Sequence, residues 1–137
     1  MARRERLIAF ALNPRGDGAW ALDRKGNIFA FGAAPEFREV PEPQPWRGGP
    51  FVAIASTPSG QGVWTLDSKG NILSFGDAPE FREVPEPQPW RGGSFVSIAS
   101  TPSGKGVWIL DTKGNLLSFG DAAELRSVQP TDAKAGR

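Results

Sequence analysis

One unit of 44 residues occurs three times in this chain, with no insertion or deletion to break the register. The stretch APEFREVPEPQPWRGG occurs twice unchanged, beginning at Ala34 and at Ala78. A period of ~40–50 residues is typical of repeat proteins in which each unit buries its apolar face against the next. Such near-identity indicates recent duplication or engineering. The residues that recur at this spacing include Trp20, Trp64 and Trp108; Asp23, Asp67 and Asp111; and Phe31, Phe75 and Phe119.

Each unit contains four short strand signals separated by turn residues. In the middle copy we predict strands at Phe51–Ser56, Val63–Leu66, Ile72–Phe75 and Glu80–Val84. Thr-Pro-Ser-Gly follows the first, Asp-Ser-Lys-Gly-Asn the second and Gly-Asp-Ala-Pro the third. These segments are rich in the residues that favour turns. The prolines of Pro-Glu-Pro-Gln-Pro after the fourth strand forbid a helix or a sheet ladder there.

Strict alternation along the first of these strands predicts two apolar faces. Val52 and Ile54 would lie on one face, and Phe51, Ala53 and Ala55 on the other. In the second strand, Trp64 and Leu66 would share a face.

Polarity rises along the unit. The first strand has no charged residue, as expected of a strand buried on both sides. The fourth alternates Phe81 and Val84 with Arg82 and Glu83, as expected of an edge. Four antiparallel strands graded in this way predict an all-β fold, a β-propeller with three four-stranded blades that run from channel to rim. A β-solenoid and a flat β-sandwich are the alternatives.

The predicted organisation is an N-terminal extension at 1–6, blades at 7–50, 51–94 and 95–130, and a polar tail at 131–137. The chain starts at an inner strand and ends at an outer one, which predicts three finished blades. A part of a longer propeller is the alternative.

The stretch Gly62–Ala78 reads G-V-W-T-L-D-S-K-G-N-I-L-S-F-G-D-A and recurs as Gly106–Ala122. It resembles a bacterial tandem propeller-type repeat whose copies read approximately G-Y-W-L-V-x-x-D-G-G-I-F-x-F-G-D-A after a V-x-I-A-x-T-P strand. It is similar, more distantly, to the blades of the regulator of chromosome condensation family. The resemblance covers nearly the whole chain and implies a propeller that serves as a binding or scaffolding module. The Pro-Glu-Pro-Gln-Pro-Trp-Arg-Gly-Gly linker departs from both families, as does Ala33 at the position of Asp77 and Asp121.

Three blades imply a partner, because propellers close with four to eight. An open arc would expose an apolar face at each end, and those faces would be complementary. We therefore expect the chain to associate with itself head to tail. A homodimer with six blades is favoured, and a homotrimer with nine is the alternative.

The composition argues against catalysis. The chain has no histidine, cysteine or tyrosine, so the usual nucleophile–base pairs and zinc sites are unavailable. We expect no enzyme activity, no cofactor and no metal. Asp23, Asp67 and Asp111 each begin a hairpin loop and are predicted to cap their own turns, and Asp77 and Asp121 are expected to form turns as well.

The charge and the hydropathy pattern argue against two classes of partner. The net charge is +1, whereas nucleic-acid proteins carry a clear basic excess. No apolar run approaches the ~20 residues of a membrane span. Without a recognisable signal peptide, a cytoplasmic location is the default expectation.

The candidate ligand-binding residues are Trp46, Arg47, Trp90 and Arg91, which lie in loops rather than strands. A tryptophan beside an arginine can stack on a sugar ring while the guanidinium donates hydrogen bonds. The indole can equally fold back as a plug that pins the loop to the neighbouring blade, and we favour the plug. The tryptophans within strands, such as Trp64, are expected to form the core between blades.

Taken together, these features predict a self-assembling propeller that acts as a scaffold or a ligand-binding module. A lectin-like protein that binds glycans or another small molecule at its inter-blade loops is one alternative. A designed or recently amplified propeller with no natural ligand is another.

Overall fold

A computed structural model describes residues 6–37, 48–81 and 90–125. Within these ranges the chain forms antiparallel strands in three sheets, one sheet for each copy of the repeat. The tandem-repeat prediction and the all-β prediction are therefore confirmed. The first sheet contains β1 (Leu7–Leu12), β2 (Gly18–Asp23) and β3 (Ile28–Gly32); the second contains β4 (Phe51–Ser56), β5 (Gly62–Asp67) and β6 (Ile72–Gly76); the third contains β7 (Phe95–Ser100), β8 (Gly106–Asp111) and β9 (Leu116–Gly120).

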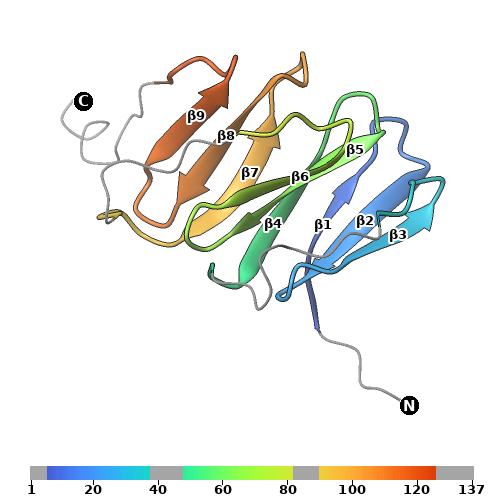
Figure 1. Cartoon of the computed structure of the whole chain (residues 1–137), viewed down its shortest axis with the longest axis horizontal. Helices are drawn as coiled ribbons and strands as arrows, with labels where there is room; N and C mark the ends of the chain where they lie inside the picture. The colour runs from blue at the N-terminus through green and yellow to red at the C-terminus, as the bar shows by residue number, and fades with distance from the viewer. Residues whose placement is uncertain (1–5, 38–47, 82–89, 126–137) are drawn as a thin grey trace, which may run out of the picture.

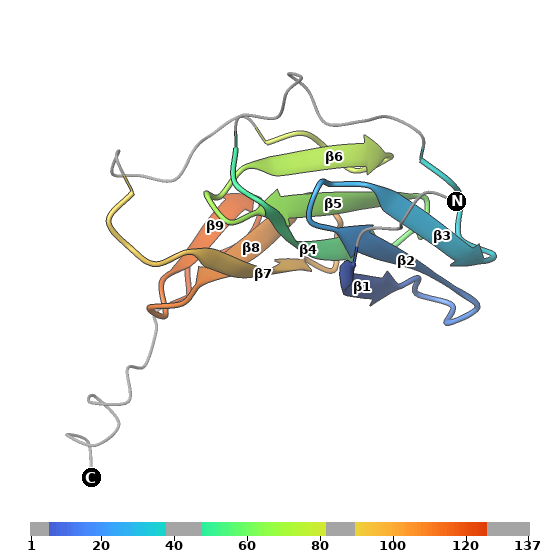
Figure 2. The same cartoon turned by 90° about the horizontal axis from the view of Figure 1, so that it is seen from below.

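The three sheets stand side by side in chain order (Figure 1). The first strands are neighbours, β4 lying between β1 and β7, and β2 and β5 also approach the first strand of the next sheet. Among the described strands, the backbones of β3, β6 and β9 do not approach a neighbouring sheet. The sheets are therefore close along their first strands and separate toward their third, as the second view shows (Figure 2).

A β-bulge in the first strand of every sheet overturns the predicted alternation. The register shifts between Phe51 and Ala53. Phe51 consequently shares a buried cluster with Ile54, between the first and second sheets. Val52 instead packs with Ala53 and Ala55, between the second and third. The prediction that Val52 and Ile54 share a face was wrong, because a bulge adds one residue and reverses the alternation beyond it.

The second strand, not the first, is the most deeply buried. Every residue of β5 is buried, whereas Val52 and Ser56 of β4 are partly exposed. β5 lies between β4 and β6 in its sheet, so both of its edges are covered as well as both faces. The prediction that burial falls from the first strand to the fourth is therefore wrong for the first two strands, because the second is buried more deeply than the first.

The predicted fourth strand is not seen where it can be checked. Glu80 and Phe81 are described and do not belong to a strand, and 82–84 lie outside the described residues. Phe81 instead inserts between sheets, with its ring centroid 6.1 Å from that of Trp64 and 6.3 Å from that of Phe119. The equivalent Phe37 lies 6.1 Å from both Trp20 and Phe75.

The core lies between the sheets, as expected for the strand tryptophans. Trp20 and Trp64 are fully buried, whereas Trp108 is partly exposed. Each indole N–H donates to a backbone carbonyl fifteen residues later, which for Trp64 is the oxygen of Pro79 at 2.9 Å. Backbone bonds also join the sheets, since Phe51 N–H donates to Arg24 O at 2.9 Å. Successive sheets are therefore held by both packing and hydrogen bonds.

Candidate binding and assembly surfaces

Trp90 and Arg91 are the two predicted ligand residues that the structure describes, because Trp46 and Arg47 lie outside the described residues. The ring of Trp90 stacks on Phe95, with centroids 5.2 Å apart and planes at 29°. Its indole N–H donates to Gly93 O at 3.0 Å, and Arg91 is exposed. The plug interpretation predicts these contacts of Trp90. Ligand binding at this pair stays a prediction.

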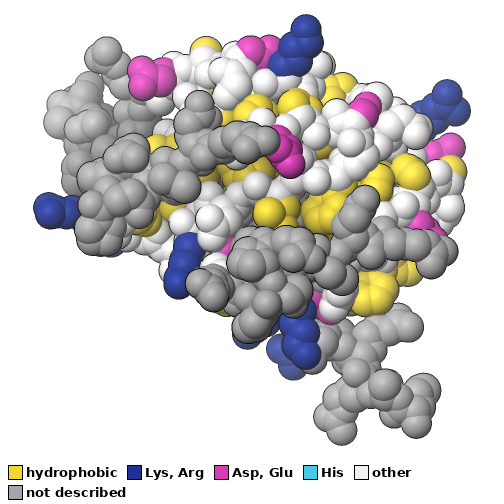
Figure 3. All heavy atoms as spheres, in the orientation of Figure 1, with side chains coloured by type: hydrophobic (Ala, Val, Ile, Leu, Met, Phe, Trp, Pro, Cys, Tyr) yellow, Lys and Arg dark blue, Asp and Glu magenta, His cyan; other side chains and the backbone are white. Residues whose placement is uncertain are grey.

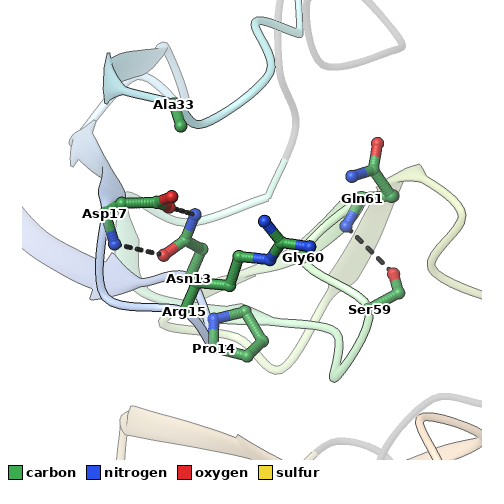
Figure 4. Close-up of a pocket in the computed structure, with 8 residues that line it drawn as sticks. All are labelled: Asn13, Pro14, Arg15, Asp17, Ala33, Ser59, Gly60 and Gln61. Atoms are coloured by element: carbon green, nitrogen blue, oxygen red, sulfur yellow. Dashed lines mark hydrogen bonds between the residues drawn. The ribbon is translucent and has the colours of Figure 1, made fainter.

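A small groove opens at each junction between sheets. The first lies between the β1–β2 loop and the β4–β5 loop, and Figure 4 shows Arg15 reaching toward Gly60 and Gln61 on its far side. The second lies at the equivalent place, between Thr57 and Ser59 on one side and Lys105 on the other. Their volumes are about 230 and 310 Å³. The first volume lies below the roughly 300–1,000 Å³ typical of small-molecule sites, and the second lies at the lower end of that range.

Asp77 joins two loops at the edge of the second groove. Its carboxylate accepts hydrogen bonds from the hydroxyls of Thr57, at 2.9 Å, and Ser59. Asp121 makes the same pair of bonds in the third sheet. These aspartates therefore connect two loops, in addition to the turn role predicted for them.

The first sheet replaces that network with a different one. Ala33 stands where the other sheets have aspartate, and Asn13 takes over the loop. Asn13 Oδ1 accepts from the backbone N–H of Gly16 and Gly18, and its amide donates to Asp17 at 2.8 Å. The loss of one carboxylate is thus matched by a local change of the loop, and Arg15 enters the groove in place of a serine.

The hairpin aspartates cap their own turns, as predicted. Asp111 accepts from the backbone N–H of Lys113 and Asn115 and from the amide of Asn115. It also accepts from Gly93 N–H at 2.8 Å, which fixes the segment that leads into β7. Burial alone would raise the pKa of Asp111, but the hydrogen bonds from Asn115, Gly93 and Lys113 outweigh it and lower that pKa. Within the described ranges no cluster of acidic residues is placed to hold a metal ion.

The first sheet has an exposed apolar face, whereas the equivalent face of each later sheet packs against the sheet before it. We call it the head face, and its exposed side chains are Leu7, Phe10, Leu12 and Phe31. Phe10 is 69% exposed, whereas the equivalent residues of the next two sheets, Ile54 and Ile98, are 7% and 9% exposed. In Figure 3 hydrophobic side chains reach the surface at the end of the molecule where the first sheet lies.

The third sheet presents the opposite apolar face. We call it the tail face, and its exposed side chains are Val96, Leu110 and Leu125. Leu110 is 36% exposed, although its equivalents Leu22 and Leu66 are fully buried. Leu125 occupies the position that Phe37 and Phe81 take in the earlier repeats, and in the described part of the chain no further sheet packs against it.

The sequence predicted an exposed apolar face at each end of the array of sheets, but it did not identify the residues that form these faces. The bulge was the missing signal, because the faces of the first strand can be assigned only when its position is known.

Comparison with known proteins finds no family model that matches the chain, and no curated protein matches it. In the described part of the chain, no helix is long and apolar enough to cross a membrane.

Proposed function

We propose that this chain is a β-propeller subunit that assembles with copies of itself into a closed ring and acts as a non-catalytic scaffold or binding module. The observation that carries the proposal is the pair of exposed apolar faces, because the equivalent faces at the two internal junctions pack against the neighbouring sheet. Six blades from two copies is the favoured ring, and nine from three copies is the alternative.

The arrangement of the sheets supports a propeller. Sheets that are close along their first strands and separate outward have the radial geometry of blades around an axis. Equivalent Trp and Phe side chains fill both internal junctions, so each sheet packs on the preceding one in the same way. Continuing this arrangement to a closed ring needs further sheets, and a second copy would supply them.

The apolar ends support association rather than a lone monomer. In repeat proteins the terminal units of a monomer usually carry a polar outer face, which keeps the array soluble. Here the terminal faces carry Phe10, Leu12 and Leu110 instead. Large contiguous apolar patches on soluble proteins mark interaction sites.

Sedimentation equilibrium of the purified chain tests this proposal. We expect twice the chain mass over the micromolar range for six blades, and three times the chain mass would indicate nine. A folded species of single chain mass throughout that range would contradict the proposal.

Ligand binding at the junction grooves is a second candidate, favoured by their repetition at equivalent places. Equivalent sites around one ring would raise avidity without tight individual sites. Lectin-like binding would show on a glycan array, and Arg91→Ala would test the loop pair while Arg15→Ala tests the first groove. An array without signal would remove the lectin-like role and leave assembly untouched.

A further inference from the structure

We infer that the ring closes by docking the head face of one copy on the tail face of a second copy, in a junction whose packing differs from that of the internal junctions. This inference rests on the proposed assembly and adds the residues that meet in the closing junction and the way their packing differs from the internal junctions. Its evidence is a position-by-position comparison of the repeats.

Differences between the first two repeats gather on the head face. Its positions comprise the four exposed residues together with Ala19, Ala21 and Phe29, and only Phe31 matches its counterpart in the second repeat. On the opposite face of the first sheet, which packs against the second, only Ile8 and Ala30 differ from their counterparts. The unpaired face has therefore changed far more than the paired one. The head-face differences are Leu7 for Phe51, Phe10 for Ile54, Leu12 for Ser56, Ala19 for Val63, Ala21 for Thr65 and Phe29 for Leu73.

The head-face differences are all apolar, which is the opposite of what solvent exposure predicts. Leu12 stands where the other two repeats have serine, and it is 60% exposed. A face in permanent contact with water gains stability or solubility from polar substitutions, not from Leu or Phe. The head face has therefore kept the character of a covered surface.

The substitutions also exchange size between neighbours. Phe10 lies opposite Ala21 in the ladder, whereas Ile54 lies opposite Thr65. A larger side chain is thus accompanied by a smaller one, which conserves volume, as packed interfaces require. On the tail face, Leu125 is smaller than the equivalent Phe81. Phe29 on the head face is larger than its equivalent Leu73. Phe29 would therefore fill part of the space that the smaller Leu125 leaves when the tail face of a second copy docks there.

The loops give a second, independent indication of head-to-tail docking. At both internal junctions a glycine of the following repeat faces a proline of the preceding one. A methyl group on Gly60 would lie 3.2 Å from Pro14 Cδ, and one on Gly104 would lie 2.8 Å from Pro58 Cδ. At the equivalent Gly16 nothing lies within 4 Å. Docking the tail face of a second copy would bring its Pro102 to this open glycine.

Two charged variants test the direction of docking. Phe10→Asp disables the head face and Leu125→Asp disables the tail face, and both side chains are more than half exposed in the single chain, so folding should survive. Each variant alone should sediment at single chain mass, with its dissociation constant raised at least tenfold, because an unpaired carboxylate would be buried in the junction. An equimolar mixture should regain a species of twice the chain mass, since the intact tail of one variant meets the intact head of the other. Gln61→Asp is the matched control, because Gln61 is an exposed loop residue at a position where the first repeat already has Asp17.

The outcomes separate the two proposals. If Leu125→Asp alone keeps the assembled mass, the head faces dock on each other and the inference is wrong, although assembly stands. If both variants alone keep the assembled mass, the ring is closed by another surface and the inference is again wrong. A wild-type chain of single mass would overturn the assembly proposal and this inference together. Circular dichroism of each variant verifies that loss of mass is not loss of fold.

Discussion

Among the described residues, Thr65 has a buried hydroxyl oxygen without a hydrogen-bond partner. It is fully buried on β5, at the position where the third repeat has Ile109 and the first has Ala21. A buried hydroxyl that lacks a partner costs about 1–3 kcal/mol. The site therefore tolerates apolar side chains better than the residue it carries.

We predict that Thr65→Val leaves the free energy of unfolding unchanged or raises it by about 1 kcal/mol, because the shape is kept and the desolvation cost is removed. Chemical denaturation measures this. Thr57→Val is the control, since the hydroxyl of Thr57 donates to Asp77, and its loss should lower stability by about 1 kcal/mol. Clear destabilisation by Thr65→Val would indicate that its hydroxyl has a partner after all.

Asp111 is expected to contribute to the stability of the fold in a way that depends on pH. Its pKa in the folded protein is lowered by hydrogen bonds from Asn115, Gly93 and Lys113, against the opposing effect of burial. A lowered folded pKa gives stability that is present above the unfolded pKa of about 3.9 and is lost as pH falls through the folded pKa. Asp111→Asn should therefore cost about 1–3 kcal/mol at pH 7 and progressively less toward pH 3. Urea titrations at both pH values give the comparison, and a cost that does not change with pH would contradict it.

Among the structural elements, the segment that follows β6 contributes one aromatic ring, that of Phe81, to the packing between sheets. Phe81 bridges Trp64 of its own sheet and Phe119 of the next. Removing a large packed side chain commonly costs about 3–5 kcal/mol, and less where the side chain is partly exposed. This segment therefore works as a wedge between sheets rather than as a strand in the described part of the chain.

We predict that Phe81→Ala destabilises the folded chain by about 2–4 kcal/mol. The matched change in the third repeat, Leu125→Ala, should cost the single chain under about 1 kcal/mol, because Leu125 is more than half exposed there. Its effect should appear in assembly instead, as a raised dissociation constant. Equal thermal destabilisation of the dissociated chains by both variants would contradict this division.

Strands were predicted well from sequence, because turn residues punctuate them. The first predicted strand of the middle repeat, Phe51–Ser56, agrees with the structure at both ends, and β5 extends the predicted Val63–Leu66 by one residue on each side. The bulge between Phe51 and Ala53 could not be predicted, because it depends on how the strand pairs with β5 rather than on local preference. The wedge role of Phe81 was also missed, since Glu80–Val84 mixes apolar and charged residues in a way that resembles an edge strand.

At the scale of the whole molecule, Gly16 and Gly60 form a matched pair. Both have a positive φ, of 77° and 78°, so alanine introduces the same backbone strain at each. Gly60 already faces Pro14, whereas Gly16 has open space. Any further difference between the two variants therefore reports on what each glycine contacts.

We predict that Gly60→Ala lowers the stability of the single chain more than Gly16→Ala does, because its methyl group meets Pro14. Gly16→Ala should in turn weaken assembly, where Pro102 of a second copy is expected to approach. Melting curves of dissociated chains and sedimentation of assembled ones give the two quantities. Assembly that is unaffected by Gly16→Ala would remove the proline–glycine contact from the closing junction.

The candidate surfaces were only partly accessible to sequence reasoning. The recurrence of one unit with too few copies for a ring indicated unpaired ends, but which side chains face outward depends on the bulge and on the packing of Phe37 and Phe81. Trp90 could be identified as a loop aromatic, whereas its stacking on Phe95 required the fold. The two junction grooves were missed because each lies between loops of different repeats.

Electron microscopy of the purified assembly distinguishes a closed ring from an open array of sheets. We expect particles that are closed rings around an axis, with six radial sheets contributed by two chains. Open arcs of three sheets, or filaments that extend without closing, would show that the chains do not form this ring.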